Sequence, residues 1–212
     1  LCAAPFFNRF RIYPAVFFLA RILGALYFIN NIDDKDLVAR SRRSLIGNSV
    51  LFLVFFLSFV IRTLLADGYA VNPETGEIFM EPYKYLTNFI EMPVVLVLFL
   101  IGVVLVLFGI GKSLLKPKFD KGIWFTGIGT VLAVLALLLV AGYNHTAYYP
   151  STSDLQSSLR LANSCSSEFT LRVMFYVSFL VPFVLAYIFY AWRSIDIHKI
   201  DEKEMKDGGH SY

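Results

Sequence analysis

The chain has 212 residues, of which 57% are hydrophobic and 17% are charged, and its formal net charge is +3. Soluble domains average about 45–50% apolar and about 25% charged residues, so the composition excludes an ordinary soluble globular protein. The basic residues lie in short segments between apolar blocks. That placement indicates membrane topology rather than a face that binds nucleic acid.

Five apolar blocks follow one another along the chain. Crossing about 30 Å of hydrocarbon takes roughly 20 residues of α-helix. The blocks cover residues 14–29, 45–65, 93–111, 122–143 and 170–192. They are too long for strands and lack the alternation of barrel strands. The sequence therefore predicts an all-α fold, a polytopic transmembrane helical bundle of about five spans in one domain.

Two features refine this prediction. The first block is short and contains Arg21. A charge near a helix centre costs about 2.5–3.5 kcal/mol, so we expect Arg21 to face other protein. Glycines of the fourth block, such as Gly122, Gly127 and Gly129, are expected to be points of close helix packing.

Basic residues alternate between the connections. Segments 30–44 and 112–121 and the tail after Trp192 are rich in Lys and Arg, whereas connections 66–92 and 144–169 hold only Lys84 and Arg160. The positive-inside rule then places the basic segments and the C-terminus in the cytoplasm. Connections 66–92 and 144–169 become outer loops.

The outer loops contain turn and packing signals. Residues 68–80 read as two short strands around a turn set by Pro73 and Gly76, which predicts a hairpin that caps the helix ends. Loop 144–169 is long and holds aromatic and apolar residues. Long loops are usually functional or disordered, and this content favours packing, so we expect the loop to lie on the outer helix ends near Glu91.

Candidate functional residues are ionisable groups in or next to the spans, namely Glu91, Arg62 and Arg172. Glu91 could relay protons, hold a cation or pair with one of the two arginines. An ion pair that locks helices together is the simpler interpretation. His145, at an outer boundary, is a weaker candidate for a haem ligand.

The rest of the sequence offers little catalytic chemistry. His198 and His210 lie in a charged tail, and Cys2 and Cys165 lack metal-binding spacing. Met92 and Met174 could be axial haem ligands in principle, although ordinary packing is the simpler role. The sequence contains no nucleophile–base pair or phosphate-binding loop, so we assign it no catalytic residue and no metal site.

Several motifs nevertheless resemble one family. They occur in the second outer loop, in the last span and at the start of the third span. They are YNHTAYYPS (143–151), LQSSL (155–159), Asn163-Ser164, Ser166-Ser167, Thr170-Leu171, Val173-Met174, Val181-Pro182, Tyr187, Trp192 and Asn88-Phe89 followed by Pro93. From about Ala25 to the C-terminus the chain resembles subunit II of cytochrome bd-type quinol oxidases.

This resemblance implies a function that hydropathy cannot supply. Such a subunit is the structural partner of a haem-bearing subunit I, which holds haem b and haem d, and the complex oxidises quinol and reduces O2 to water. It lies in the bacterial inner membrane, and some members bind a lipid or a structural quinone. The family's subunit II has more than five spans, with its acidic proton-path residues in an N-terminal half, so we expect this chain to be a C-terminal portion.

Two other functions remain open from the residues alone. Spans with intramembrane charges also suit a transporter or permease subunit, although only Pro182 sits deep in a span. A membrane assembly scaffold would share every feature of an oxidase subunit, and only the identity of its partner would separate the two.

Overall fold

The computed structural model describes residues 9–116, 119–151 and 153–195. The predictions that concern Cys2, His198, His210 and the basic tail beyond Ile195 lie outside the described residues. Within the described ranges, five helical segments are long and apolar enough to cross a membrane. The predicted fold class, an all-α transmembrane bundle of about five spans, is confirmed.

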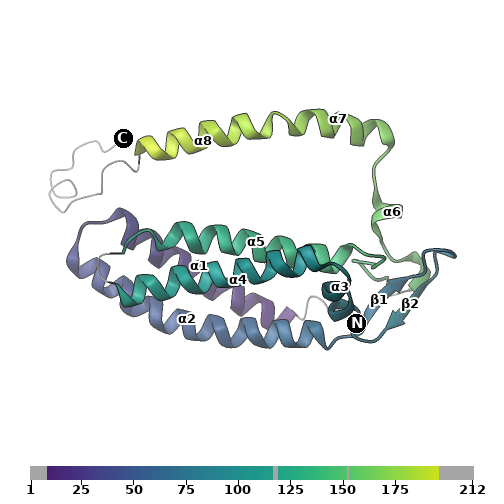
Figure 1. Cartoon of the computed structure of the whole chain (residues 1–212), viewed down its shortest axis with the longest axis horizontal. Helices are drawn as coiled ribbons and strands as arrows, with labels where there is room; N and C mark the ends of the chain where they lie inside the picture. The colour runs from purple at the N-terminus through teal and green to yellow at the C-terminus, as the bar shows by residue number, and fades with distance from the viewer. Residues whose placement is uncertain (1–8, 117–118, 152, 196–212) are drawn as a thin grey trace.

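Four of these helices pack together lengthwise (Figure 1). They are α1 (Arg9–Asn31), α2 (Lys35–Leu64), α4 (Pro93–Leu115) and α5 (Gly122–Gly142). The pairs α1–α2 and α4–α5 are helical hairpins, which meet through α1 on α5 and α2 on α4. Asp34 caps α2 by accepting hydrogen bonds from the amides of Asp36 and Leu37, and Pro93 opens α4, where its missing N–H is not needed.

Apolar side chains fill the space between the two hairpins. One cluster includes the fully buried Ile22, Leu26 and Leu45 together with Ile110. A second cluster extends from Phe99 of α4 to the opposite end of the bundle. Many other apolar side chains of these helices remain exposed on the outside, as expected for helices that face lipid.

The α4–α5 contact is unusually close because glycines line both helices. A Cβ added at Gly102 would lie 2.6 Å from the backbone nitrogen of Ala133 and 2.8 Å from the carbonyl oxygen of Gly129. A Cβ added at Gly129 would lie 2.6 Å from the carbonyl oxygen of Gly102. The Cα hydrogens of these glycines therefore point at carbonyl oxygens of the facing helix, which is the geometry of weak Cα–H···O bonds.

Two buried hydroxyls continue this pattern toward the other end of the pair. The Oγ of Ser113 and the Oγ1 of Thr126 are buried without a conventional hydrogen-bond partner. They face Gly122 and Gly109 respectively, at the positions where a side chain would otherwise begin. The predicted glycine packing is thus found at Gly122 and Gly129, whereas Gly127 faces open space, since it lies on another side of α5.

Short elements cover the end of the bundle opposite the α1–α2 connection. They are β1 (Gly68–Val71), β2 (Ile78–Glu81), α3 (Lys84–Glu91), a 3-10 turn η1 (Leu155–Ser157) and α6 (Leu161–Ser164). The strands pair antiparallel, with Val71 opposite Ile78. Gly76 adopts a φ of +73° in the turn, a conformation that glycine adopts without strain. The predicted hairpin is confirmed.

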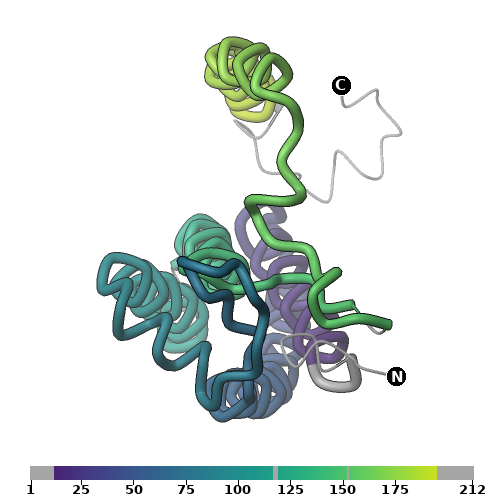
Figure 2. The backbone as a smooth tube through the Cα atoms, turned by 90° about the vertical axis from the view of Figure 1, so that its right-hand side faces the viewer, coloured from purple at the N-terminus to yellow at the C-terminus, as the bar shows by residue number. Residues whose placement is uncertain are grey.

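The fifth span stands apart from the other four. It consists of α7 (Glu168–Ser178) and α8 (Val181–Ile195), which α6 links to the outer loop (Figures 1 and 2). The helix is interrupted at Phe179 and Leu180, just before Pro182, which cannot donate a helical hydrogen bond. No described residue of α7 or α8 is buried.

The glycine contact yields a prediction about stability. Gly102→Ala or Gly129→Ala should lower the free energy of unfolding by about 1–3 kcal/mol, because the added methyl group forces two backbones apart. Unfolding in mixed detergent, followed by circular dichroism, measures the effect.

Gly111→Ala and Gly127→Ala are the matched controls, because an added Cβ at either site meets no atom within 4 Å. They should be neutral or slightly stabilising, since alanine favours a helix by up to about 1 kcal/mol over glycine. Equal losses in all four variants would contradict the proposed contact.

Candidate functional site

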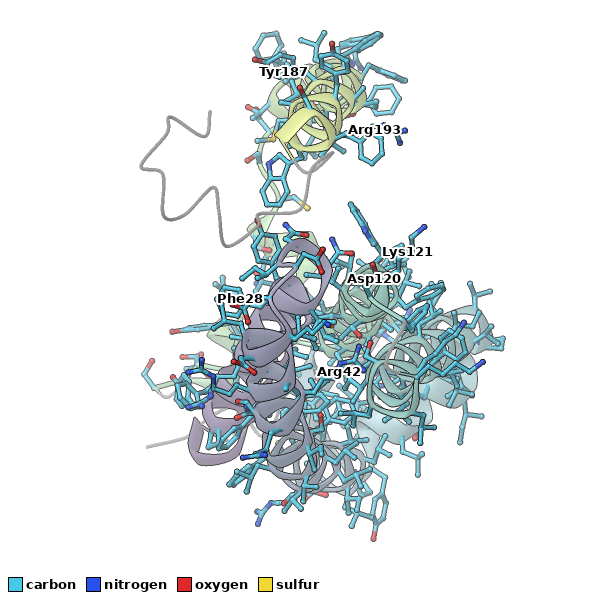
Figure 3. All side chains as sticks on the ribbon, turned by 90° about the vertical axis from the view of Figure 1, so that its left-hand side faces the viewer. Phe28, Arg42, Asp120, Lys121, Tyr187 and Arg193 are labelled. Carbon is cyan, nitrogen blue, oxygen red and sulfur yellow. The ribbon has the colours of Figure 1, made fainter. Side chains whose placement is uncertain are left out.

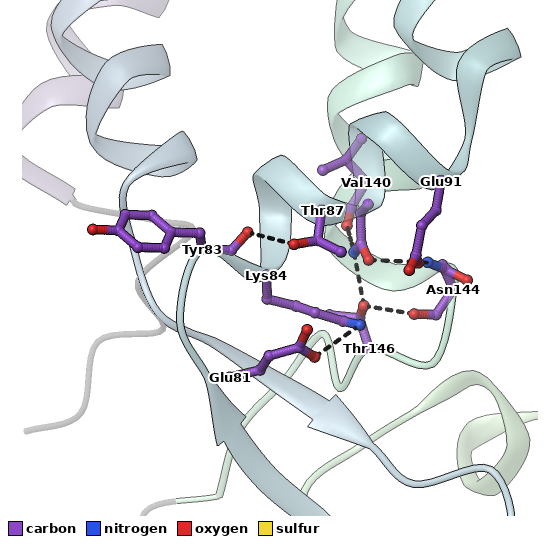
Figure 4. Close-up of polar contacts among 9 residues, drawn as sticks. Glu81, Tyr83, Lys84, Thr87, Glu91, Val140, Asn144 and Thr146 are labelled. Carbon is purple, nitrogen blue, oxygen red and sulfur yellow. Dashed lines mark hydrogen bonds and ion pairs between the residues drawn. The ribbon is translucent and has the colours of Figure 1, made fainter.

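The polar residues of the end of the bundle that carries the hairpin converge on α3, at the junction of the hairpin and the bundle. This helix buries Tyr85, Asn88 and Phe89 on one side and exposes Glu91 in its last turn. Asn88 and Glu91 are three residues apart, so they lie near each other on the helix surface. One edge of α3 therefore presents a buried amide beside the exposed carboxylate of Glu91, which Figure 4 shows with its partner Asn144.

Asn88 is fully buried and its side chain joins three segments of the chain. Its Nδ2 donates to the carbonyl oxygen of Val140 at 2.9 Å and to the Oγ1 of Thr146 at 2.9 Å. Its Oδ1 accepts a hydrogen bond from the Nδ2 of Asn144 at 3.1 Å. Both amide protons are used, so the cost of burying this polar group is offset.

The turn after α5 places Asn144 for this role. Asn144 and His145 have φ angles of 56° and 52°, in the left-handed region that asparagine tolerates better than most residues. Beyond the turn, the amide of Ala147 donates to the carbonyl oxygen of Tyr69 at 2.9 Å, and the His145 carbonyl accepts from Val71 at 2.7 Å. The turn thus ties the loop to strand β1.

Glu91 is bound by asparagine and not by arginine. The Nδ2 of Asn144 donates to the Oε2 of Glu91 as well as to Asn88. Arg172 instead pairs with Glu168 of its own helix, with 2.6 Å between Nη2 and Oε1. Arg62 is exposed at the end of α2, and the ion pairs found among the described residues do not include it. The simpler expectation, a Glu91–arginine pair, is therefore not realised.

The remaining candidate, His145, contributes its backbone. Its side chain is exposed, and its carbonyl oxygen holds β1 as described above. The four candidates Glu91, Arg62, Arg172 and His145 are thus not brought into one site. Their functional roles remain predictions.

Arg21, which is expected to face other protein, has an exposed side chain, and that expectation stays a prediction. Its guanidinium carbon lies 5.7 Å from the centre of the Phe17 ring, and its side chain lines a recess between α1 and α2. The predicted block ended at residue 29, whereas α1 continues to Asn31.

Loop 144–169, predicted to lie near Glu91, binds Glu91 through Asn144 at its start and packs mainly on the hairpin. Gln156 pairs with both backbone groups of Ile78, donating to the carbonyl and accepting from the amide at 2.9 Å each. The Nη1 of Arg160 donates to the carbonyl of Gly76 at 2.9 Å. With the Asn144 contact to Glu91, these bonds hold the loop against the hairpin and α3.

Two residues with buried ionisable side chains, Lys84 and Tyr85, were not identified from the sequence. Lys84 is buried with its Nζ 3.1 Å from the Oε2 of Glu81, and nothing in a single lysine three residues after a glutamate signals burial. Burial, with the neighbouring Tyr69 phenol as the smaller cause, raises the pKa of Tyr85 to about 12. The Tyr85 phenol therefore stays neutral at physiological pH, and the centre of the cap carries no charge from it.

Taken together, the geometry defines a multi-pass helical membrane protein with a polar cap at one end. The hydrogen-bonded groups of the cap are mainly amides, hydroxyls and backbone carbonyls, which hold segments together. Within the described ranges no three His, Cys, Asp or Glu side chains gather as they would around a metal ion.

The chain belongs to the family described as cytochrome bd terminal oxidase subunit II, which it matches over residues 4–195. Membership agrees with the resemblance seen in the loop and last span. It also makes the chain a multi-pass inner-membrane protein, together with the five apolar helices.

Named relatives support the same assignment. The chain is similar to cytochrome bd-I ubiquinol oxidase subunit 2 of Escherichia coli strains K12, O6:H1 and O157:H7, with 28% identity over 156 residues in each case. The match covers 72% of this chain and 39% of each relative. The chain thus spans about two-fifths of the length of the curated relatives it matches.

The polar cap yields a second prediction. Asn88→Leu should lower the free energy of unfolding by about 2–4 kcal/mol, because Val140, Thr146 and Asn144 lose their buried partner. It should also make loop 144–169 more susceptible to limited proteolysis, which is followed by gel electrophoresis.

The matched control is Thr87→Val on the same helix. The Thr87 hydroxyl donates to the carbonyl of Tyr83 at 3.3 Å (Figure 4), and Thr87 is only half-buried. The free energy of unfolding of that variant should lie within about 0.5 kcal/mol of the parent value. Its rate of proteolysis should equal that of the parent within experimental error. An Asn88→Leu protein as stable and as resistant as the control would contradict the bonding described here.

Proposed function

We propose that this chain acts as the C-terminal part of subunit II of a cytochrome bd-type quinol oxidase. In that role it is a structural partner of a haem-bearing subunit I, and the complex oxidises quinol and reduces O2 to water. The observation that carries the proposal is the family match over residues 4–195. The relatives' names, which identify them as ubiquinol oxidase subunits, support it.

The chemistry of the candidate residues in this chain supports placing the haems in the other subunit. We assign haem b and haem d to subunit I and no catalytic residue to this chain. His145 has an exposed side chain on a strained turn, which is a poor place to hold a haem whose ligands need a dry pocket. Glu91 and the arginines lie at helix ends, where they suit structural roles.

The fifth span supports the partnership. Helices α7 and α8 carry large exposed apolar side chains, including Phe183 and Tyr190, each 73% exposed. A helix apolar on every side is stable in lipid or against another apolar helix. It therefore offers a surface against which subunit I can pack.

The interior of the bundle suits a bound apolar chain. A cavity of about 310 Å³ lies between α1, α2, α4 and α5, with Phe52, Val106 and Ala133 among its lining residues. Its walls are almost wholly apolar, so a lipid acyl chain or the tail of a structural quinone is the ligand class that fits. Thr130 is the polar side chain among the lining residues.

The orientation follows from charge. The α1–α2 and α4–α5 connections and the C-terminal end of α8 lie at one end of the molecule (Figure 1). We place this basic end, and with it the C-terminus, in the cytoplasm. A transporter or permease subunit and an assembly scaffold are the alternatives, and family membership does not favour either.

Co-purification tests the proposal. The affinity-tagged chain, expressed in its native host, should bring down a haem-containing partner, and membranes lacking the chain should lose cyanide-tolerant quinol oxidase activity. Full activity without the chain would contradict the proposal. Substrate flux in liposomes that hold the chain alone would support a transporter instead.

A tryptophan scan of α8 sharpens the test. Replacing residues 183–190 one at a time should weaken co-purification along one helical face, because a bulky ring disrupts a packed interface but is accepted by lipid. Val131→Trp on α5, where Val131 is 67% exposed, is the control and should leave co-purification unchanged. Uniform tolerance along α8 would place the partner elsewhere.

A further inference from the structure

A second recess lies between α1 and α2 at the basic end of the bundle, with a volume of about 390 Å³. Figure 3 looks onto this end, and Phe28 marks the part of α1 concerned. Two arginines, two serines and an apolar floor line it. They include Arg21, Gly24 and Phe28 of α1 and Arg40, Ser41 and Ser44 of α2.

The recess lies at the edge of the apolar layer. Helix α5 begins at Gly122, directly after the charged residues Asp120 and Lys121, so the apolar layer ends near Gly122. Leu26 of α1 packs beside Gly122 and therefore lies at the same level. Arg21 is five residues further into the layer, or about 7.5 Å along the helix. An arginine stem is long enough to bring its guanidinium back across that distance to the interface.

Neither arginine of the recess has an anionic partner in the described chain. The ion pairs found there join Lys84 to Glu81 and Arg172 to Glu168. Arg40 is exposed, and Arg21 contacts only the Phe17 ring in the interactions found for it. Two cations beside an apolar layer without a counter-ion favour an anion from outside the chain.

The serines add hydrogen-bond donors at the same place. The buried Asn48 donates through its Nδ2 to the Oγ of Ser44 at 2.9 Å and to the Ser44 carbonyl at 2.7 Å. The Ser44 hydroxyl accepts in that contact, so its own proton is left for another acceptor. Ser41 lines the recess one turn closer to the end of the bundle.

The floor of the recess is empty and apolar. A Cβ added at Gly24 would meet no atom within 4 Å, and Phe28 is half exposed beside it. The acidic residues of the α1–α2 connection do not line the recess. Among them, Asp34 already accepts hydrogen bonds as the N-cap of α2.

We propose that this recess binds the phosphate of an anionic phospholipid. Arg40, Ser41 and Ser44 donate to the phosphate oxygens, and Arg21 turns from Phe17 to pair with the same group. The glycerol and the start of an acyl chain lie over Gly24 and Phe28. The inference requires only that the chain spans a membrane, and it is separate from the proposed oxidase function.

Native mass spectrometry of the full chain, extracted in detergent with its co-purifying subunits and stripped of lipid, tests the proposal. Phosphatidylglycerol should be retained, whereas phosphatidylcholine and inorganic phosphate should not. Arg21→Gln and Arg40→Gln should each weaken phosphatidylglycerol binding about fivefold, the factor that corresponds to ~1 kcal/mol for each basic residue near an anionic lipid.

Two matched controls separate the recess from general charge and fold. Arg43→Gln removes the same charge from an exposed position that does not line the recess, and it should bind lipid like the parent. Gly24→Leu should weaken binding by filling the floor, whereas Gly127→Leu, which also extends into open space, should not.

Three outcomes would overturn the proposal. Equal retention of phosphatidylglycerol and phosphatidylcholine would show that the net charge of the lipid does not determine binding. Retention of inorganic phosphate with equal affinity would make the recess a free-anion site rather than a lipid site. Equal losses in Arg43→Gln and Arg40→Gln would show a general surface effect.

Discussion

The close approach of α4 and α5 is the contact on which the rest of the fold depends. In a bilayer, apolar helices gain little from leaving lipid for each other, so their association relies on tight packing and on polar contacts. Gly102 and Gly129 let the two backbones touch, and this places the carbonyl of Val140 at the end of α5 beside α3. Without that position, Asn88 would have no backbone acceptor at the centre of the cap.

The two ends of the bundle are fixed by different chemistry. At the end that carries the hairpin, asparagine and threonine side chains bridge α3, α5 and the loop. At the basic end, the Nη1 of Arg42 donates to the carbonyls of Ser113 at 2.6 Å and Lys116 at 3.3 Å. A cation there satisfies carbonyls at the C-terminus of α4 and complements the negative end of its dipole.

Much of this architecture is predictable from the sequence because it follows from local rules. Block length and charge alternation predict the spans, and the turn residues around Pro73 and Gly76 predict the hairpin. The pairing of side chains is not predictable in this way. From the sequence, Glu91 could pair with an arginine of more than one helix. Only the three-dimensional arrangement shows that the turn at Asn144 places the Asn144 side-chain amide against the Glu91 carboxylate.

The glycines illustrate the same limit. Gly127 and Gly129 differ by two positions, or about 200° around a helix, so one faces α4 and the other faces open space. Sequence alone cannot say which glycine does which, because it does not specify the rotation of α5 about its axis.

The fifth span stands apart from the other four helices in the described part of the chain (Figure 1). No described residue of α7 or α8 is buried. Lipid alone would tolerate such a helix, so its exposure does not require a partner. The large aromatic side chains along it, however, bury far more area against a packed protein surface than small residues do. The apolar area buried is largest when a second apolar protein surface packs against these side chains. We assign that role to subunit I.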